Sequence, residues 1–415
     1  MASTPGDIPT NARRPMFALF AANTISQLGN TFTMLAIPWF VLATTGSASK
    51  TGITVAVGAV PSILVGIFGG AIVDRIGYKR ASIISDVLSG LSVLLIPLLH
   101  QTIGLTFWQL LVLVFLGAFF DGPGTTARRA LFPELVHWAG GSLERANAGY
   151  NTTGRIASLL GQPVAGLLIA ALGPSNLLWV DAVTFGVSSV ITLILIPNIP
   201  RERPVAMLGG FRGYLRDVRS GFQFLLAKRL LLWMIVAFSV GGLVAEPLYG
   251  VILPVYANEV FGTAAQLGFI FAALGAGSIL GNIVYVRIAA QFSRSAILLG
   301  GFGIRAAAFA IMLTMPPWWM IAAAIFVGAV AFEPINPMTM SLMQEQVPSG
   351  MRGRVFGAQT AIGASAFPVG LVAYGFLMSH LGLQQTLVLF VALNALLPIV
   401  MVFLPALRRI PRPIP

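Results

Sequence analysis

A succession of long apolar segments most constrains what this sequence can fold into. Each has about 20 mostly apolar residues, the length that a helix needs to cross the hydrocarbon core of a bilayer. Twelve such segments follow one another, so the sequence predicts an all-α membrane protein with twelve transmembrane helices. The segments are residues 16–44, 52–73, 81–99, 105–124, 149–172, 176–198, 230–256, 264–286, 295–315, 318–341, 355–378 and 384–406.

The scarcity of charge supports this interpretation. Charged residues make up 9% of the 415-residue chain, whereas a soluble domain carries about 25%, so the chain cannot cover a surface in water. The absence of cysteine excludes disulfides, thiol nucleophiles and thiolate metal sites. The three histidines are scattered along the chain. We therefore expect neither a metal nor any other cofactor.

Lysine and arginine indicate the orientation of the segments, because basic residues accumulate in cytoplasmic loops. With the polar N-terminus inside, 22 of the 25 basic residues lie in inward loops, Lys50 lies in an outward loop, and Arg155 and Arg305 fall within segments. The first segment is too long for the ~7–15-residue core of a cleaved signal peptide. We expect a multi-pass protein of the cell (inner) membrane, with cytoplasmic N- and C-termini. The same bias explains the net charge of +12, so no nucleic-acid partner is expected.

The chain divides into two related halves of six segments. Pro163 and Pro368 occupy similar contexts 205 residues apart, and a basic, amphipathic connection separates the halves. Such duplicated bundles hold their substrate between them, near the bilayer midplane. The expected organisation is a cytoplasmic tail (1–15), a six-helix bundle (16–198), an amphipathic linker on the inner membrane surface (199–229), a second six-helix bundle (230–406) and a cytoplasmic tail (407–415).

The loop between the second and third segments, residues 70–80, combines two glycines, one acid and three bases. It resembles the first sequence motif of the major facilitator superfamily, Gly-x-Leu-Ala-Asp-Arg-x-Gly-Arg-Lys, in the correct loop. The resemblance implies a cytoplasmic gate in which the acid contacts the other bundle, while the glycines permit a tight turn. Alternatively, the loop has no gating role, and its bases only determine the orientation of the adjacent helices in the membrane. The residues of this gate motif are Gly70, Asp74, Arg75, Gly77, Lys79 and Arg80.

Further stretches resemble the drug-efflux branch of that superfamily, of the macrolide and enterobactin exporter type. They are residues 26–29, 35–39, 45–47, 130–136, 181–185 and 347–355. The sequence departs from the branch at Asn30, where such exporters often place an aspartate, in the loosely matched antiporter pattern around Pro163, and in an eroded second copy of the gate motif near Arg287.

The resemblance implies a transporter rather than an enzyme, which works by rocker-switch alternating access. The expected function is proton-coupled efflux of small amphipathic drugs of the macrolide, tetracycline or hydrophobic-cation type, and members of the family usually act as monomers. The alternative is a transporter of a siderophore, metabolite or lipid, with or without proton coupling. A membrane enzyme or sensor finds no support, since no catalytic dyad or appended domain is present.

Charged residues inside membrane segments are costly, at about 2.5–3.5 kcal/mol each on insertion scales, and mark functional candidates. Glu246 and Glu333 each lie deep in a segment and directly precede a proline. They are the candidates for proton coupling; the alternative for Glu246 is a structural hydrogen bond. We expect Arg305 to pair with Glu333, either as a structural contact or as part of coupling, with Asn336 nearby. Arg305 and Asn336 are also candidates for the substrate cavity.

Two stripes of polar residues at helical spacing are candidates for the substrate cavity, because polar faces avoid lipid. One lies in the first segment and consists of Asn23, Gln27 and Asn30; the other lies in the fifth and consists of Asn151, Arg155, Ser158 and Gln162. Contact between helices is the alternative for the first stripe.

Three further acids are expected to have structural roles. Asp86 lies about two turns from Arg80, and Asp121 lies about two turns from Arg128, so local salt bridges or support of the gate are expected. Asp181 lies near the outer end of its segment.

Overall fold

A computed structural model describes residues 13–140, 142–198, 220–348, 351–408 and 410 of the chain. Within these residues the secondary structure consists of helices and turns, without strands, which confirms the all-α fold. Contacts divide the chain into two compact units, one comprising Met1–Phe40 and Val57–Val205 and the other Val41–Ala56 and Ala206–Pro415.

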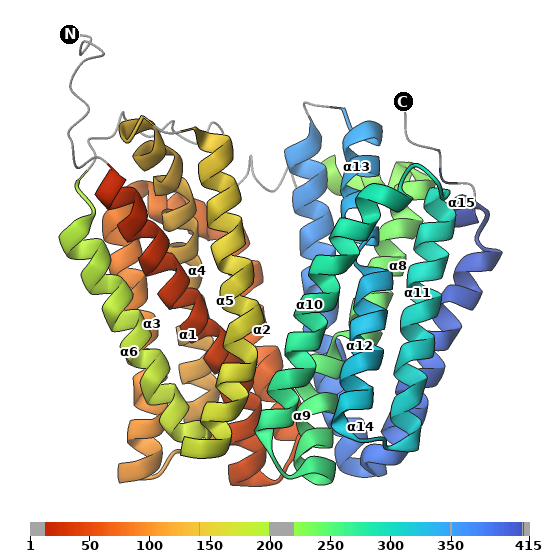
Figure 1. The fold of residues 1–415 in the computed structure, drawn as a ribbon, viewed down its shortest axis with the longest axis horizontal. Helices are drawn as coiled ribbons and strands as arrows, with labels where there is room; N and C mark the ends of the chain where they lie inside the picture. Colours follow the sequence, from red (N-terminus) through yellow and green to blue (C-terminus); the bar gives the residue numbers. More distant parts are fainter. Residues whose placement is uncertain (1–12, 141, 199–219, 349–350, 409, 411–415) are drawn as a thin grey trace. The chain divides into compact units, whose positions relative to one another are not determined.

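The first unit is built from α1 (Arg13–Thr45), α2 (Ala48–Ile76), α3 (Tyr78–Thr102), α4 (Phe107–Trp138), α5 (Leu143–Leu172) and α6 (Pro174–Leu195). Helix α3 packs against both α4 and α6 (Figure 1). Glycines separate two of the helix pairs: Gly77 (φ 91°) lies between α2 and α3, and Gly173 (φ 84°) lies between α5 and α6. These φ values are accessible to glycine at little cost, so the turns depend on it.

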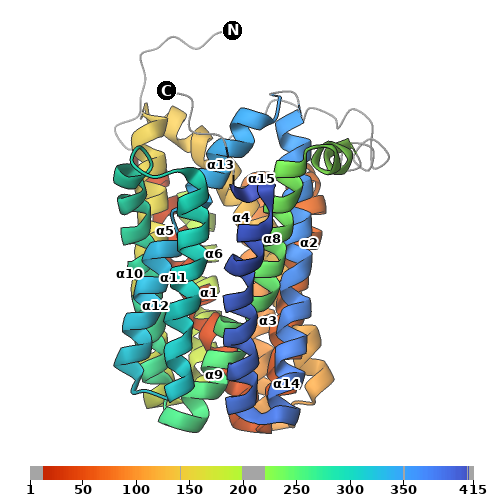
Figure 2. The same ribbon diagram turned by 90° about the vertical axis from the view of Figure 1, so that its right-hand side faces the viewer.

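The second unit begins with α8 (Arg229–Ala245), which continues through the π-helical turn η1 (Leu248–Ile252), α9 (Leu253–Tyr256) and the π-helical turn η2 (Ala257–Phe261). It goes on with α10 (Ala264–Ile288), α11 (Arg294–Ala310), the 3₁₀ turn η3 (Ile311–Thr314), α12 (Trp318–Phe332), α13 (Ile335–Gln346), α14 (Arg352–Phe403) and α15 (Pro405–Arg408). Helices α10, α12 and α11 lie side by side, and α8 packs against α14 (Figure 2).

Helices α14 and α5 bring the number of membrane spans to the expected twelve. Helix α14 has 52 residues, about 78 Å at 1.5 Å per residue, which far exceeds a bilayer core of about 30 Å. Its backbone is broken at Gly382 (φ 78°, ψ 175°), which divides it into two spans. Helix α5 contributes a further, shorter apolar stretch, Leu159–Leu172, in addition to the long apolar helices. The described residues therefore contain the twelve expected spans.

Both expected coupling acids lie where a membrane helix is interrupted. Glu246 follows the last residue of α8 and precedes Pro247, while Glu333 follows the last residue of α12 and precedes Pro334. Proline lacks an N–H donor and clashes with the preceding turn. The N–H of each acid still bonds four residues back, but the proline after it interrupts the pattern, and the carbonyl of each acid accepts from the residue three positions on. Interrupted helices of this kind place polar groups at membrane depth.

The end of α1 and the beginning of α2, Val41–Ala56, cluster with the second unit. Ser49 Oγ donates a hydrogen bond to Ser379 Oγ (2.7 Å) and lies within 3.2 Å of the Gly375 carbonyl oxygen. A Cβ atom at Gly52 would lie 2.4 Å from the Leu371 carbonyl oxygen. Helix α2 therefore approaches α14 closely through small residues.

Candidate functional site

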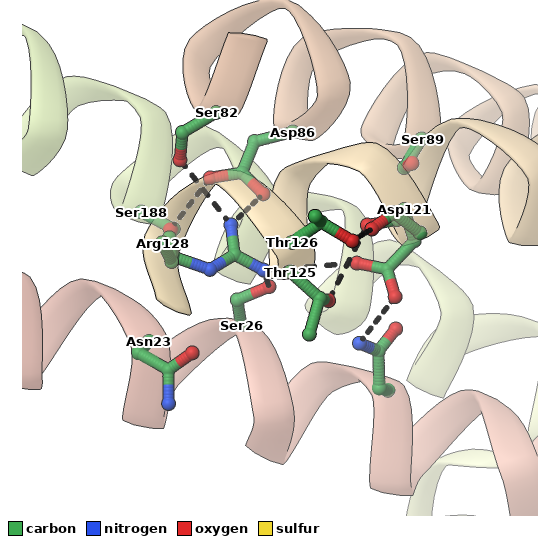
Figure 3. Close-up of polar contacts among 12 residues, drawn as sticks. Asn23, Ser26, Ser82, Asp86, Ser89, Asp121, Thr125, Thr126, Arg128 and Ser188 are labelled. Carbon is green, nitrogen blue, oxygen red and sulfur yellow. Dashed lines mark hydrogen bonds and ion pairs between the residues drawn. The ribbon is translucent and has the colours of Figure 1, made fainter. Parts of the chain in front are cut away.

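A buried arginine forms the centre of the first unit. Arg128 on α4 is 1% exposed and is among the largest fully buried side chains of the described residues. Its Nη1 atom donates to Asp86 Oδ1 on α3 at 2.7 Å, and the second oxygen of Asp86 accepts from Ser188 Oγ on α6 at 2.7 Å (Figure 3). Because buried charges are tolerated only when they are paired and hydrogen-bonded, this contact fixes three helices together.

A second carboxylate, Asp121, approaches the same guanidinium less closely. Its Oδ1 atom lies 3.8 Å from Arg128 Nη2, and its Oδ2 atom accepts from Asn30 Nδ2 at 3.2 Å. The side chain of Asp121 is 22% exposed, whereas that of Asp86 is fully buried. Arg128 Nη2 also donates to Ser26 Oγ on α1 at 3.3 Å (Figure 3). The cluster thus contains two carboxylates and one guanidinium, and the more accessible acid has the weaker ion pair.

This geometry corrects one expectation and confirms another. Asp86 pairs with Arg128, which is 42 residues away in the sequence, rather than with Arg80. Asp121 does form the expected local pair with Arg128. The sequence signal for Asp86 was incomplete, because nothing in the spacing of α3 indicates which residue of α4 faces it.

The polar stripe of α1 contacts its neighbouring helices. Asn23 is buried and its Oδ1 atom accepts from Tyr150 Oη on α5 at 2.9 Å. A Cβ atom at Gly154 would lie 2.8 Å from Gln27 Oε1, so Gln27 packs against α5 as well. Asn30 reaches Asp121 on α4. These contacts favour the helix-contact alternative for Asn23 and Gln27, and they connect Asn30 to the charged cluster.

The stripe of α5 is only partly described. Gln162 is partly buried. The side chains of the other three members lie outside the described ones, so their place in a cavity stays a prediction: Asn151, Arg155 and Ser158.

Asp181 on α6 has two hydroxyl partners. Thr33 Oγ1 on α1 donates to its Oδ2 atom, and Thr184 Oγ1 donates to its Oδ1 atom at 3.1 Å. A Cβ atom at Gly29 would overlap both Asp181 Oδ1 and Thr184 Oγ1. Asp181 is fully buried, and its contacts connect α1 to α6.

The charged residues of the second unit are arranged differently from the sequence expectation. Glu333 Oε1 accepts from Asn282 Nδ2 on α10 at 3.3 Å, and the described residues contain no ion pair between Glu333 and Arg305. The expected Arg305–Glu333 pair is therefore wrong in this structure. Instead, the Arg305 guanidinium carbon lies 3.6 Å from the ring centroid of Phe332. Residue 332, rather than 333, faces α11 because adjacent helical residues point in directions about 100° apart.

Glu246 and Asn336 are exposed. A carboxylate on a membrane span avoids lipid, so its exposed side faces water or the other parts of the protein. Glu246 interacts electrostatically with Arg305, beyond ion-pair distance.

A bidentate ion pair near the beginning of α11 was not anticipated from the sequence. Arg294 Nη1 and Nη2 donate to the two carboxylate oxygens of Glu345 on α13 at 2.7 and 2.6 Å. The pair joins the ninth and tenth spans, as Asp86 and Arg128 join the third and fourth, with acid and base exchanged. The sequence pattern that could have indicated this ion pair is a base at the start of one span and an acid at the end of the next.

The gate motif lies at the end of α2 and the start of α3. Asp74 and Lys79 are partly buried, whereas Arg75 and Arg80 are exposed. Gly77 supplies the left-handed turn between the helices, and the surroundings of Gly70 lie outside the described side chains. The opening of a gate stays a prediction. Among the described residues, no group of three or more His, Cys, Asp or Glu side chains could hold a metal ion.

Comparison with known proteins agrees with this architecture. The sequence model of the Major Facilitator Superfamily matches residues 19–264 and 245–415. The chain is 31% identical over 407 residues to the multidrug efflux pump Tap of Mycolicibacterium fortuitum, with 97% of this chain and 98% of Tap covered. It is 27% identical over 377 residues to the enterobactin exporter EntS of Escherichia coli, with 86% and 84% covered.

A solved structure shows the same fold at low sequence identity. The nucleoside transporter NupG superimposes with a TM-score of 0.77 at 12% identity and covers 93% of this chain and 97% of its own. Twelve spans in two units, the gate motif and the family match over almost the whole chain lead to one conclusion. The chain belongs to the Major Facilitator Superfamily of multi-pass membrane transporters, is not an enzyme, and has relatives in the drug-efflux branch.

Proposed function

We propose that the protein exports amphipathic drugs across the cell (inner) membrane in exchange for protons. In this proposal it acts as a monomer with cytoplasmic termini, and its two bundles alternate by a rocker-switch movement. The support for drug export is the similarity to proteins named as multidrug efflux pumps, which extends over almost the full length of both chains. One proton moving down 100 mV supplies about 2.3 kcal/mol, enough to drive accumulation about fifty-fold.

The observation that carries proton coupling is the imbalance of charge around Arg128. Among the described side chains of this cluster, one guanidinium faces two carboxylates, so these groups carry an excess negative charge inside a membrane bundle. Binding one proton would remove that charge, whose burial is expensive. We assign the proton to Asp121, because it is more exposed than Asp86 and lies farther from the guanidinium.

Asn30 supports this assignment. It stands where related exporters often carry an aspartate, and here it donates to Asp121 Oδ2. The acid is thus provided by α4 instead of α1, at almost the same place in the bundle. Asp121 is added to the two acids of the second unit that we propose for coupling, Glu246 and Glu333. Their positions at interrupted helices and their incomplete burial give them access to protons.

Transport by purified protein in liposomes tests the proposal. Wild-type protein should extrude ethidium or tetracycline faster when a pH gradient is imposed. Asp121→Asn should retain downhill movement of the drug but lose the acceleration by the gradient, as should Glu246→Gln or Glu333→Gln if these acids take part. Arg229→Gln, which alters an exposed charge at the start of α8, is the control. Full gradient-driven transport by all three acid variants would contradict proton coupling through these groups.

The alternative substrate class is a siderophore, metabolite or lipid. It is supported by the similarity to the enterobactin exporter. A susceptibility panel in a pump-deficient host separates the two classes. Unchanged susceptibility to every macrolide, tetracycline and cationic dye, despite folded protein in the membrane, would favour the alternative.

The gate motif has its own test. Asp74→Asn should abolish transport while the folded protein remains in the membrane. Transport at the wild-type rate would leave the motif with a role in topology only.

A further inference from the structure

Arg305 is a buried cation without a carboxylate or hydrogen-bond partner among the described residues. Its side chain is 6% exposed, and neither an ion pair within 4.0 Å nor a hydrogen bond is formed by its guanidinium in that part of the chain. A guanidinium offers five N–H donors, and none of them has a partner within the described part of the chain.

Aromatic rings surround this cation on several sides. The guanidinium carbon lies 3.6 Å from the ring centroid of Phe332, 5.1 Å from that of Phe302 and 5.9 Å from that of Phe309. A cation–π contact contributes about 0.5–2 kcal/mol, whereas the burial of an ion costs several kcal/mol. The rings fix the plane of the guanidinium, but they leave its donors and its charge unsatisfied.

The acids of the second unit do not provide the missing partner. Glu333 is hydrogen-bonded to Asn282 on α10. Glu246 interacts electrostatically with Arg305, but it is exposed and lies beyond ion-pair distance. Tyr249 also interacts electrostatically with Arg305 and with Glu246. An oxygen-bearing group of a ligand could therefore contact the guanidinium without displacing an existing ion pair.

We infer that Arg305 is a binding site for an anionic oxygen group on a flat, aromatic substrate. The guanidinium fork would bind a carboxylate, an enolate or a catecholate through two parallel hydrogen bonds. The rings of Phe302, Phe309 and Phe332 would contact the apolar part of the same molecule. This inference rests on the proposed export of amphipathic compounds and adds a specificity: acidic aromatic substrates use Arg305, and permanently cationic ones do not.

Two drugs of opposite charge character test this site. Tetracycline carries an enolate-type group at neutral pH, whereas ethidium is a permanent cation without an acidic oxygen. Arg305→Gln should raise the KM for tetracycline at least tenfold and leave the KM for ethidium within about twofold. Arg305→Lys, which retains the charge but not the planar fork, should have an intermediate effect. Arg229→Gln, at the exposed start of α8, should change neither.

Equilibrium binding makes the test independent of transport. The intrinsic fluorescence of tetracycline and of salicylate reports binding to purified protein, and Arg305→Gln should weaken both at least tenfold while its melting temperature stays close to that of the wild type. An equal loss for tetracycline and ethidium, or no loss for either, would overturn the inference. If wild-type protein binds neither acidic probe, the site is also refuted. If it binds them but transports no drug, the proposed function fails and the site stands.

Discussion

Replacement of either acid beside Arg128 should separate a structural carboxylate from a functional one. Asp86→Asn removes the charge from the 2.7 Å ion pair between fully buried side chains. Loss of one partner of a buried ion pair costs about 3–5 kcal/mol, because the other charge stays buried without compensation. Asp121 remains 3.8 Å from the guanidinium, so we expect the lower end of this range, about 3 kcal/mol.

Asp121→Asn is the matched control, with the same chemical change on the same partner. Its ion pair is longer and its side chain is 22% exposed, so the loss of stability should be smaller than that of Asp86→Asn. The excess negative charge also disappears, which further reduces the loss. Asp86→Asn should therefore lose stability, whereas Asp121→Asn should lose proton coupling.

Thermal unfolding of the purified protein in detergent, followed by tryptophan fluorescence and by size-exclusion chromatography after heating, measures the difference. The double variant Asp86→Asn/Arg128→Gln should lose less stability than the sum of the two single variants, because both changes remove the same ion pair. Equal stability losses in the two single variants would refute the assignment. So would a double variant with the sum of the single losses.

Three further predictions concern packing and ion pairs. Gly29→Ala should lower the yield of folded protein because its Cβ would overlap side chains of α6, whereas Gly186→Ala, with nothing within 4 Å of its Cβ, should not; fluorescence-detected size-exclusion compares the two. Glu345→Gln should lower the melting temperature, since it breaks a bidentate pair to Arg294, which is 3% exposed, and Arg294→Lys should recover the loss only in part because lysine lacks the planar fork. Gly77→Ala should cost about 1–2 kcal/mol, because its φ of 91° disfavours a Cβ; an unchanged denaturation midpoint would contradict the strain.

The positions of the spans were largely predictable, and their interruptions were less so. The first segment was expected at 16–44, and α1 extends over Arg13–Thr45. The segment expected at 318–341 instead divides into α12 and α13 around Glu333 and Pro334. Apolar composition continues across such a break, so hydropathy does not register it. Proline marks it only in retrospect, since Pro38 and Pro61 lie inside continuous helices.

The candidate site was predictable in its residue types but not in its pairings. Arg305 was identified because a charge inside a membrane segment is rare and costly. The expected partner of Arg305 was Glu333, but the neighbouring residue Phe332 contacts it instead. Proximity in sequence does not determine how a helix is rotated about its axis. Arg128 was expected to have only a local partner, and it joins residues from four helices.

The sequence by itself determined the number and order of the spans. Each span satisfies its own backbone hydrogen bonds and must be long and apolar enough for the bilayer, and the loop charges predict its direction. These are properties of consecutive residues. Only the tertiary structure decided which charges meet, because Asp86 and Arg128 are brought together by the rotation and depth of separate helices. The same packing left Arg305 among phenylalanine rings, without an ion pair in the described part of the chain.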